Sequence, residues 1–259
     1  MRKTKLKSLA FFFVFFGLLM GTSQTLADEL KVAVASNFYP TMKVIAKNYE
    51  IKTAGSTGQQ HKVILIPGSS GKHYAQIMNG APFDIFFSAD TERAKLLEQE
   101  GKVLAGTRFT YALGKLILWS SLDDYVDPKG EVLNKKDFRY LAIANPKLAP
   151  YGKSAKEALR SLGLWTNLKK RLVQGENIAQ TFQFISTGNA KLGFVAYSQI
   201  MNSGLSIDGS FWEVPQSIYK PIEQQAVLLK DSYIGRDFLS FVKSDESLSI
   251  IYESGYGLP

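Results

Sequence analysis

A short apolar run, a polar turn and a helical pattern follow one another five times along this chain. The five stretches read LKVAVASNFYPTMKVIAKNYE, HKVILIPGSSGKHYAQIMNG, FDIFFSADTERAKLLEQEG, YLAIANPKLAPYGKSAKEALRSLG and LGFVAYSQIMN. Strands that alternate with helices favour an α/β fold with mainly parallel sheets, because strands buried on both faces read as continuous apolar runs. We therefore predict an α/β protein.

The order of the predicted strands also indicates two lobes. A second group of strands begins near YALGKLILWSS, and a late strand, QQAVLLK, follows FWEVPQSIYKPIE. If the chain leaves a first lobe near Thr110 and returns near Pro215, two crossover segments join the lobes and act as a hinge beside a cleft. This predicts lobe 1 over residues 28–110 and 215–259, and lobe 2 over residues 111–214.

The N-terminus carries the three parts of a secretory signal peptide. Basic residues precede an apolar run, Leu9 to Met20, and small residues before Asp28 offer a cleavage site. The apolar run is shorter than the ~20 residues of a membrane-spanning helix, and an uncleaved anchor is the alternative. We predict that residues 1–27 are removed and that the chain is exported, most simply to the periplasm.

Charge and cysteine content exclude several classes of protein. The full chain has 31 basic and 23 acidic residues, a net charge of +8. Four basic residues and no acidic ones lie in the predicted signal, which leaves 27 against 23 and a net charge of +4. No long basic run remains, so nucleic acid is not an expected partner. The absence of cysteine excludes disulfides, thiolate metal sites and a lipidated N-terminal cysteine.

The turn in ILIPGSSGKHYAQIMNGAP has the order of parts of a phosphate-binding loop, a strand followed by a glycine-rich turn and a helix. A nucleotide-binding P-loop needs four residues between its glycines and a hydroxyl residue after the lysine. Gly68 and Gly71 are only three positions apart, and His73 stands where the hydroxyl should be. The turn therefore predicts an anion site at a helix start, without nucleotide or magnesium.

Four strand-to-helix junctions could contribute to such a site, because ligands of open α/β sheets bind beyond the carboxyl ends of the strands. Each junction alone also fits a helix cap, which contributes ~1 kcal/mol to folding and nothing to a ligand. The junctions supply, in chain order, Ser36 and Asn37, then Ser69 and Ser70, then the backbone N–H of Tyr151, then the backbone around Asn177 and Ile178.

Six motifs resemble the periplasmic molybdate-binding proteins of ABC importers. They occur in family order over essentially the whole mature chain, and the NPxxAPYG segment together with GNAxxGFVAxSQ is specific to that family. The motifs are VAVASNF, PGSSGK, FDIFFSAD, AIANPKLAPYGKSAKEAL, GENIAQ and TGNAKLGFVAYSQI. The resemblance implies a two-lobed binding protein of type II topology that closes on molybdate or tungstate and delivers it to a membrane permease. It also implies a monomer without catalysis or cofactor.

The resemblance assigns site residues position by position. Hydrogen bonds to the oxyanion would come from Ser36, Asn37 and Ser70, with Ser69 adjacent, and from the backbone N–H groups of Tyr151 and Ile178. The metal would be bound as its oxyanion, with no direct cation ligands. Many relatives place a tyrosine hydroxyl in the pocket at the position of Ala196, whereas Tyr197 is shifted by one residue here. We therefore leave Tyr197 out of the predicted site.

Two alternatives remain open at this point. The ligand could be another oxyanion such as sulfate, or the serine turn could serve a periplasmic phosphoryl or sulfuryl hydrolase. An activated serine needs a base, and His73, the only candidate near that turn, is poorly placed along a helix to serve Ser70.

Six further polar residues are expected to have structural roles. Both histidines, His61 and His73, are expected on the surface or at helix flanks, and Lys72 and Lys153 as solvated surface residues. Asp84 and Asp90 are expected in loop or capping roles. None of these residues is included in the predicted site.

Overall fold

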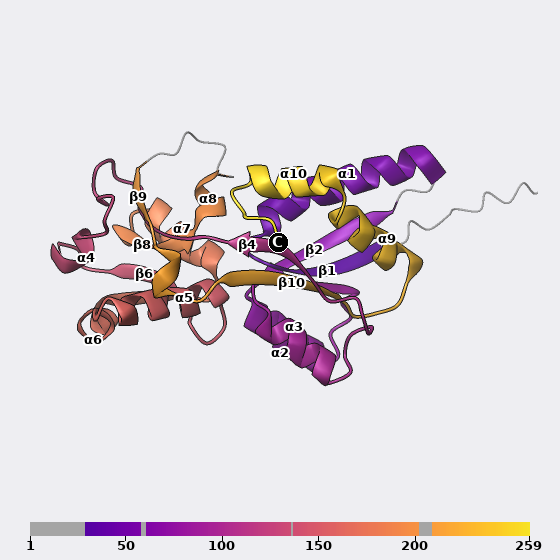
Figure 1. Cartoon of the computed structure of the whole chain (residues 1–259), viewed down its shortest axis with the longest axis horizontal. Coiled ribbons are helices and arrows are strands. Elements are labelled where there is room, and N and C mark those ends of the chain that lie inside the picture. Colours follow the sequence, from indigo (N-terminus) through magenta and orange to yellow (C-terminus); the bar gives the residue numbers. More distant parts are fainter. Residues whose placement is uncertain (1–28, 58–60, 136, 202–208) are drawn as a thin grey trace, which may run out of the picture.

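The computed structural model describes residues 29–57, 61–135, 137–201 and 209–259. The predicted signal peptide, residues 1–27, lies outside these ranges. The described chain forms two α/β units side by side, each around its own five-stranded sheet (Figure 1). We call residues 29–114 and 222–259 lobe 1, and residues 116–213 lobe 2. Of the helices in the described ranges, none combines the length and apolar character that a membrane span requires.

The sheet of lobe 1 has the strand order β2-β1-β3-β10-β4. Helices α1, α9 and α10 cover one face, and α2 and α3 cover the other (Figure 1). The strands are β1 (Glu29–Ala35), β2 (Lys62–Gly68), β3 (Ile85–Ser88), β4 (Phe109–Gly114) and β10 (Ile222–Leu228). The helices are α1 (Tyr39–Thr57), α2 (Ser70–Met78), α3 (Glu92–Gln99), α9 (Tyr233–Val242) and α10 (Asp245–Glu253).

The sheet of lobe 2 repeats this pattern with the order β7-β6-β8-β5-β9. Helices α5 and α6 lie on one face and α7 and α8 on the other (Figure 1). The strands are β5 (Leu116–Ser120), β6 (Leu141–Ala144), β7 (Leu172–Gly175), β8 (Leu192–Ala196) and β9 (Ser210–Glu213). The helices are α4 (Val132–Lys135), α5 (Pro150–Ser161), α6 (Trp165–Leu168), α7 (Ile178–Ser186) and α8 (Tyr197–Met201), with 3-10 turns at Lys169–Arg171 and Gln216–Ile218.

The continuous apolar runs arise because each central strand is covered on both faces. In β3, Ile85 and Phe87 pack with the core under α1 and α9, whereas Phe86 packs with the core under α2 and α3. Successive side chains of a strand point to opposite faces, so a strand covered on both sides needs apolar residues at every position. The predicted α/β architecture with two lobes is confirmed.

The prediction of mainly parallel sheets is only half right. Strand β1 pairs in parallel with β2 and β3, and β6 with β7 and β8, but β10 and β5 pair antiparallel with both of their neighbours. The reason lies in the connections between the lobes. Strands β4 and β10 lie side by side, but β4 leads out of lobe 1 and β10 leads back in, so they run in opposite directions.

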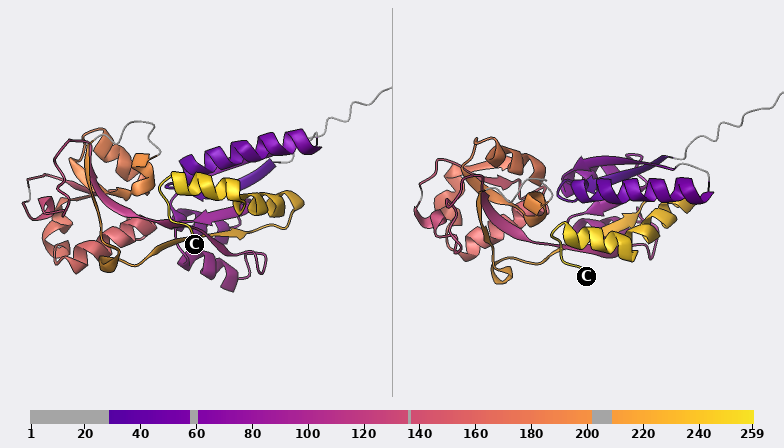
Figure 2. Two further views of the ribbon diagram at one scale, coloured as in Figure 1. Left: turned by 45° about the horizontal axis from the view of Figure 1, so that its top comes forward. Right: turned by 90° about the horizontal axis from the view of Figure 1, so that it is seen from above.

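The lobes are joined by two crossovers and by the C-terminal segment. The chain passes from β4 to β5 at Lys115 and returns between β9 and β10, as the two views of Figure 2 show. Near the first crossover, Leu113 and Gly257 exchange backbone hydrogen bonds of 2.8 and 2.9 Å. This bridge fixes the C-terminal residues against the hinge strand β4.

The expectation that both histidines lie at the surface or at helix flanks is wrong. His61 is 6% exposed and His73 is 1% exposed. The His73 ring packs edge-on against Phe83 and Phe86, and its Nδ1 lies 3.1 Å from Gln76 Oε1. Burial lowers the pKa of His73, because a charged imidazole would lose its hydration inside lobe 1.

Helix α5 lies so close to strand β6 that one position must be glycine. A Cβ atom at Gly152 would lie 2.1 Å from the backbone oxygen of Ala144. We expect Gly152→Ala to lower the free energy of unfolding by ~1–3 kcal/mol or more, because backbone atoms cannot give way as a flexible side chain can. Gly55→Ala is the matched control: Gly55 is exposed in α1 with no atom near its Cβ position, so the change should stabilise by ~0.5–1 kcal/mol. Urea denaturation of both variants measures the difference, and equal effects would contradict the close packing.

The buried His73 should make stability depend on pH. Above pH 6.5, the ordinary pKa of histidine, the His73 imidazole is neutral in the folded and the unfolded chain and makes no pH-dependent contribution to stability. Below pH 6.5, the His73 imidazole is protonated in the unfolded chain but stays neutral in the folded chain. The free energy of unfolding therefore falls by up to ~1.4 kcal/mol for each pH unit. We expect His73→Gln to show a smaller loss than the wild-type chain between about pH 7 and pH 5.5 in urea titrations. Parallel curves for the two proteins would refute a neutral buried His73.

Candidate functional site

The paired strands of each lobe end level with one another, and this brings the polar turns together. In lobe 1, Ala35 is paired with Gly68, and the Ser36 N–H donates to the Gly68 carbonyl at 2.9 Å. In lobe 2, Ala144 is paired with Gly175 in the same way, and the Asn145 N–H donates to the Gly175 carbonyl at 2.8 Å. Each lobe therefore presents two neighbouring strand-to-helix junctions toward the other lobe.

One small pocket collects the predicted site residues from both lobes. Its volume is about 10 Å³, far below the roughly 300–1,000 Å³ of pockets that take drug-sized ligands. None of the residues that line it carries a charge. They are Ala35, Ser36, Asn37, Gly68, Ser69, Ser70, Ala89, Ala149, Pro150, Tyr151, Asn177 and Ile178. All six residues predicted to bind the ligand thus surround one cavity.

The three serines of lobe 1 keep hydroxyl protons available for a ligand. Ser70 Oγ accepts a hydrogen bond from the Ala89 N–H at 2.9 Å, which fixes the oxygen and leaves its own proton free. Ser69 precedes α2 but makes no side-chain capping bond, and its buried hydroxyl has no partner among the described residues. The Ser36 hydroxyl likewise makes no hydrogen bond to the described chain, and only 8% of the residue is exposed. For these serines, the helix-cap interpretation does not account for the hydroxyl groups.

Lobe 2 contributes backbone N–H groups at two helix starts. Tyr151 follows Pro150 in the first turn of α5, and Ile178 is the first residue of α7. Neither N–H has a hydrogen-bond partner in the described structure, as the geometry of a first helical turn requires. Asn177 does act as a cap, since its side chain accepts from the Gln180 N–H at 3.0 Å. The pocket therefore faces the positive ends of two helix dipoles from this lobe.

The side chain of Asn37 is not directed to a ligand. Its Nδ2 donates to Gln224 Oε1 at 2.7 Å and to the Tyr256 hydroxyl at 3.1 Å, which uses both amide protons inside the protein. The donor of Asn37 that stays without a partner among the described residues is its backbone N–H. Sequence reasoning found the residue but could not say which of its donors is available.

Two buried residues behind the pocket were missed by the sequence analysis. Gln224 and Tyr256 lie 187 and 219 positions from Asn37, and they are 0% and 2% exposed. No local signal marks either residue, because each stands in a segment that only tertiary contacts bring to the pocket. Tyr197, by contrast, is not among the residues that line the pocket, and its ring packs 6.0 Å from that of Phe211.

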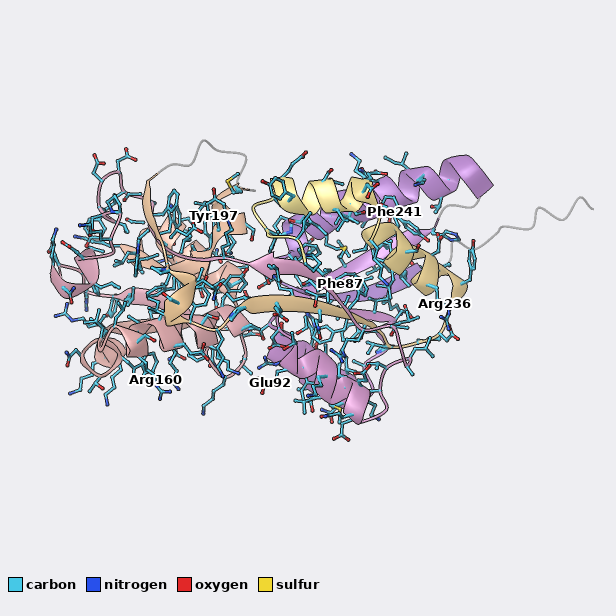
Figure 3. The ribbon with its side chains drawn as sticks, in the orientation of Figure 1. Phe87, Glu92, Arg160, Tyr197, Arg236 and Phe241 are labelled. Carbon is cyan, nitrogen blue, oxygen red and sulfur yellow. The ribbon has the colours of Figure 1, made fainter. Side chains whose placement is uncertain are left out.

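Charged groups gather at the rim of the cleft and pair across it. Lys72 Nζ lies 2.8 Å from Glu176, and Lys153 Nζ lies 2.7 Å from Glu92, which stands at the end of α3 nearer to lobe 2 (Figure 3). The Lys153 ammonium holds the pKa of Glu92 below its usual range. Both lysines are about half exposed, so the expectation of surface residues holds, but each bridges the two lobes.

Backbone contacts close the same rim. The Gly71 N–H donates to the Leu148 carbonyl at 2.8 Å, and Arg93 donates to the Lys147 carbonyl at 3.0 Å. The same arginine pairs with Asp90, which also accepts from the Arg93 N–H at the start of α3, so the capping role predicted for Asp90 is confirmed. The lobes are therefore in contact around the pocket.

The hydrolase alternative needs His73 as the base for a serine of the turn. His73 is not among the pocket residues, and its ring is buried under β3. Within the described ranges, no group of three or more His, Cys, Asp or Glu residues could hold a metal ion. The position of His73 therefore does not favour the hydrolase alternative.

The model of the family described as "Bacterial extracellular solute-binding protein" matches residues 30–257. The chain belongs to this family. Molybdate-binding protein ModA of Azotobacter vinelandii is 47% identical to this solute-binding protein over 245 residues, 93% of this chain and 94% of the relative. Molybdate-binding protein ModA of Rhodobacter capsulatus is 46% identical over 233 residues, 89% and 88% of the two chains.

A solved structure shows the same likeness in three dimensions. The Azotobacter vinelandii periplasmic molybdate-binding protein superposes with a TM-score of 0.83 at 42% identity, covering 89% of this chain and 99% of that one. The resemblance inferred from the motifs and the two-lobed binding-protein fold are both confirmed by these comparisons.

Proposed function

We propose that this protein captures molybdate, and also tungstate, in the periplasm and delivers it to the membrane permease of an ABC importer. The observation that carries the proposal is the small, charge-free pocket at which hydroxyl and N–H donors from both lobes meet. The identity of 46–47% to two molybdate-binding proteins supports it. Cleavage of residues 1–27, release as a soluble monomer and the absence of catalysis belong to the same proposal.

A pocket built only from donors suits molybdate, because at neutral pH this dianion has four acceptor oxygens and no proton to give. A hydrogen bond to a charged group contributes ~1.5–3 kcal/mol. Six such bonds can offset the desolvation of a dianion and still leave a nanomolar dissociation constant, near −12 kcal/mol. The helix N-termini add ~0.3–1 kcal/mol each without a titratable cation in the pocket. Affinity should therefore vary little with pH.

The same donors discriminate against phosphate. Hydrogen phosphate carries an O–H, so a serine hydroxyl would have to accept from the ligand where it donates to molybdate, and the lost bond to the charged ligand costs ~1–3 kcal/mol or more. Sulfate has no proton and must be rejected by size, because its shorter bonds would not reach donors on both lobes at once. Tungstate has nearly the size of molybdate, so the pocket should accept both.

The proposal is tested by isothermal titration of the mature chain with molybdate, tungstate, sulfate and phosphate. We expect tight binding of the first two and at least a hundredfold weaker binding of the others, about 2.7 kcal/mol or more. Sulfate affinity comparable to that of molybdate would favour the alternative of a binding protein for another oxyanion. Hydrolysis of phosphate or sulfate esters that depends on Ser70 would favour an enzyme instead.

Removal of the Ser36 hydroxyl tests the pocket directly, because this hydroxyl makes no hydrogen bond within the described protein that the substitution would break. We expect Ser36→Ala to weaken molybdate binding about tenfold to a hundredfold, the value of one hydrogen bond to a charged group, and to leave the melting temperature of the free protein unchanged. Ser186→Ala is the control, since Ser186 is exposed on α7 and contacts only its own helix through the Gln183 carbonyl. An unchanged affinity of Ser36→Ala would remove Ser36 from the site.

A further inference from the structure

A layer of uncharged, buried side chains lies directly behind the pocket, at the hinge between the lobes. Gln224 stands at its centre, on strand β10, which returns the chain from lobe 2 to lobe 1. The residue is fully buried, and the pairing of β10 with β4 shifts its register between Gln224 and Gln225. Bulges are over-represented next to active sites, where they can redirect a side chain.

The oxygen of the Gln224 amide holds lobe 1. It accepts from Asn37 Nδ2 at 2.7 Å and lies 3.2 Å from the Tyr111 hydroxyl, whose one proton it shares with the Ser88 carbonyl at 3.1 Å. Tyr256 fixes the other side of the same turn. Its hydroxyl donates to the Asn37 carbonyl at 2.8 Å and accepts from Asn37 Nδ2 at 3.1 Å. The turn that carries Ser36 and the Asn37 N–H is thus held in place by hydrogen bonds to the side chain and the carbonyl of Asn37.

The nitrogen of the Gln224 amide faces lobe 2. A Cβ atom at Gly114 would lie 2.3 Å from the Tyr151 hydroxyl and 3.0 Å from Gln224 Nε2, so both groups surround this glycine at the end of β4. The amide is close enough to oppose part of the rise in the Tyr151 pKa that burial causes, but the two groups lack the geometry of a hydrogen bond. Both are fully buried, and neither Gln224 Nε2 nor the Tyr151 hydroxyl has another partner among the described residues.

Two facing buried groups without partners are costly, at ~1–3 kcal/mol each, and a small hinge movement would pair them. Tyr151 makes the pairing relevant to the ligand, because its backbone N–H lines the pocket while its phenol reaches the hinge. Binding at the N–H and pairing of the hydroxyl with Gln224 would then draw α5 toward lobe 1 together. The bound dianion would contact the backbone N–H of Tyr151, and the Gln224 amide would contact the phenol hydroxyl of the same residue.

We propose that Gln224 is a positioning residue of the oxyanion site, which holds the Asn37 turn of lobe 1 through its oxygen and the Tyr151 phenol of lobe 2 through its nitrogen when the lobes close on the ligand. This inference rests on the proposed function. A neutral amide is the suitable group, because it is donor and acceptor at once and places no negative charge behind a bound dianion.

Stopped-flow and equilibrium binding of molybdate to variants of the mature chain test the proposal. We expect Tyr151→Phe and Gln224→Met each to raise the dissociation rate about tenfold, the value of one buried hydrogen bond, with association rates changed less than threefold. The double variant should be no weaker than Gln224→Met alone, since both changes remove the same pairing. Independent, multiplying effects of the two changes would overturn the inference.

Tyr111→Phe is the matched control. It removes a buried hydroxyl that also bonds to Gln224 Oε1, but from lobe 1 alone, so it should lower the melting temperature of the free protein without raising the dissociation rate. An increase in the dissociation rate with Tyr111→Phe equal to that with Tyr151→Phe would show a general loss of stability and refute the positioning role. Tyr151→Phe keeps the test valid if Gln224→Met fails to fold.

The wild-type chain separates this inference from the proposed function. If it binds sulfate or phosphate and not molybdate, the proposed ligand is wrong, and the same variants are measured with the anion that binds. Unchanged dissociation of that anion from Tyr151→Phe would then overturn the role of Gln224 on its own. If the wild-type chain binds none of the four anions, both proposals fail.

Discussion

The arrangement of this protein depends on strands that end level with one another in each lobe. Because β1 pairs with β2 through Ala35 and Gly68, and β6 with β7 through Ala144 and Gly175, the turns after the four strands lie at two facing edges. Each turn leads into a helix of at least nine residues, and the first residues of α2, α5 and α7 line the pocket. The pocket is thus a consequence of strand register repeated in two lobes.

The pocket uses neutral groups, and the layer behind it does the same. The tyrosine hydroxyls of Tyr111, Tyr151 and Tyr256 are buried, and burial raises the pKa of each well above its usual range, so none of them ionises at neutral pH. Full charges are kept at the rim, where Lys72 and Lys153 pair with carboxylates of the opposite lobe and remain about half exposed. Exposed pairs of this kind contribute little to stability, ~0–1 kcal/mol each. Neutral hydrogen-bond donors thus line the buried pocket, and the charged side chains of Lys72 and Lys153 lie at the solvent-exposed rim.

Much of the fold could be predicted from local patterns. Continuous apolar runs followed by polar turns indicated the strands, and the PGSSGK turn indicated an anion site without nucleotide because its glycine spacing was wrong for a P-loop. Parallel pairing was overestimated, since strands at the crossovers look like the others in sequence. The burial of His73 was also missed, because a single histidine in a helix gives no local sign of the rings of Phe83 and Phe86 against which it packs.

The sequence by itself determined the class of fold, six of the residues that line the pocket and the family, because these follow from apolar periodicity, turn chemistry and short motifs along the chain. Only the tertiary structure decided which atoms of those residues are available. Asn37 turns its side chain toward Gln224 and Tyr256, which lie 187 and 219 positions away. A hydrogen bond depends on distance and angle in space, and no pattern of neighbouring residues contains that information.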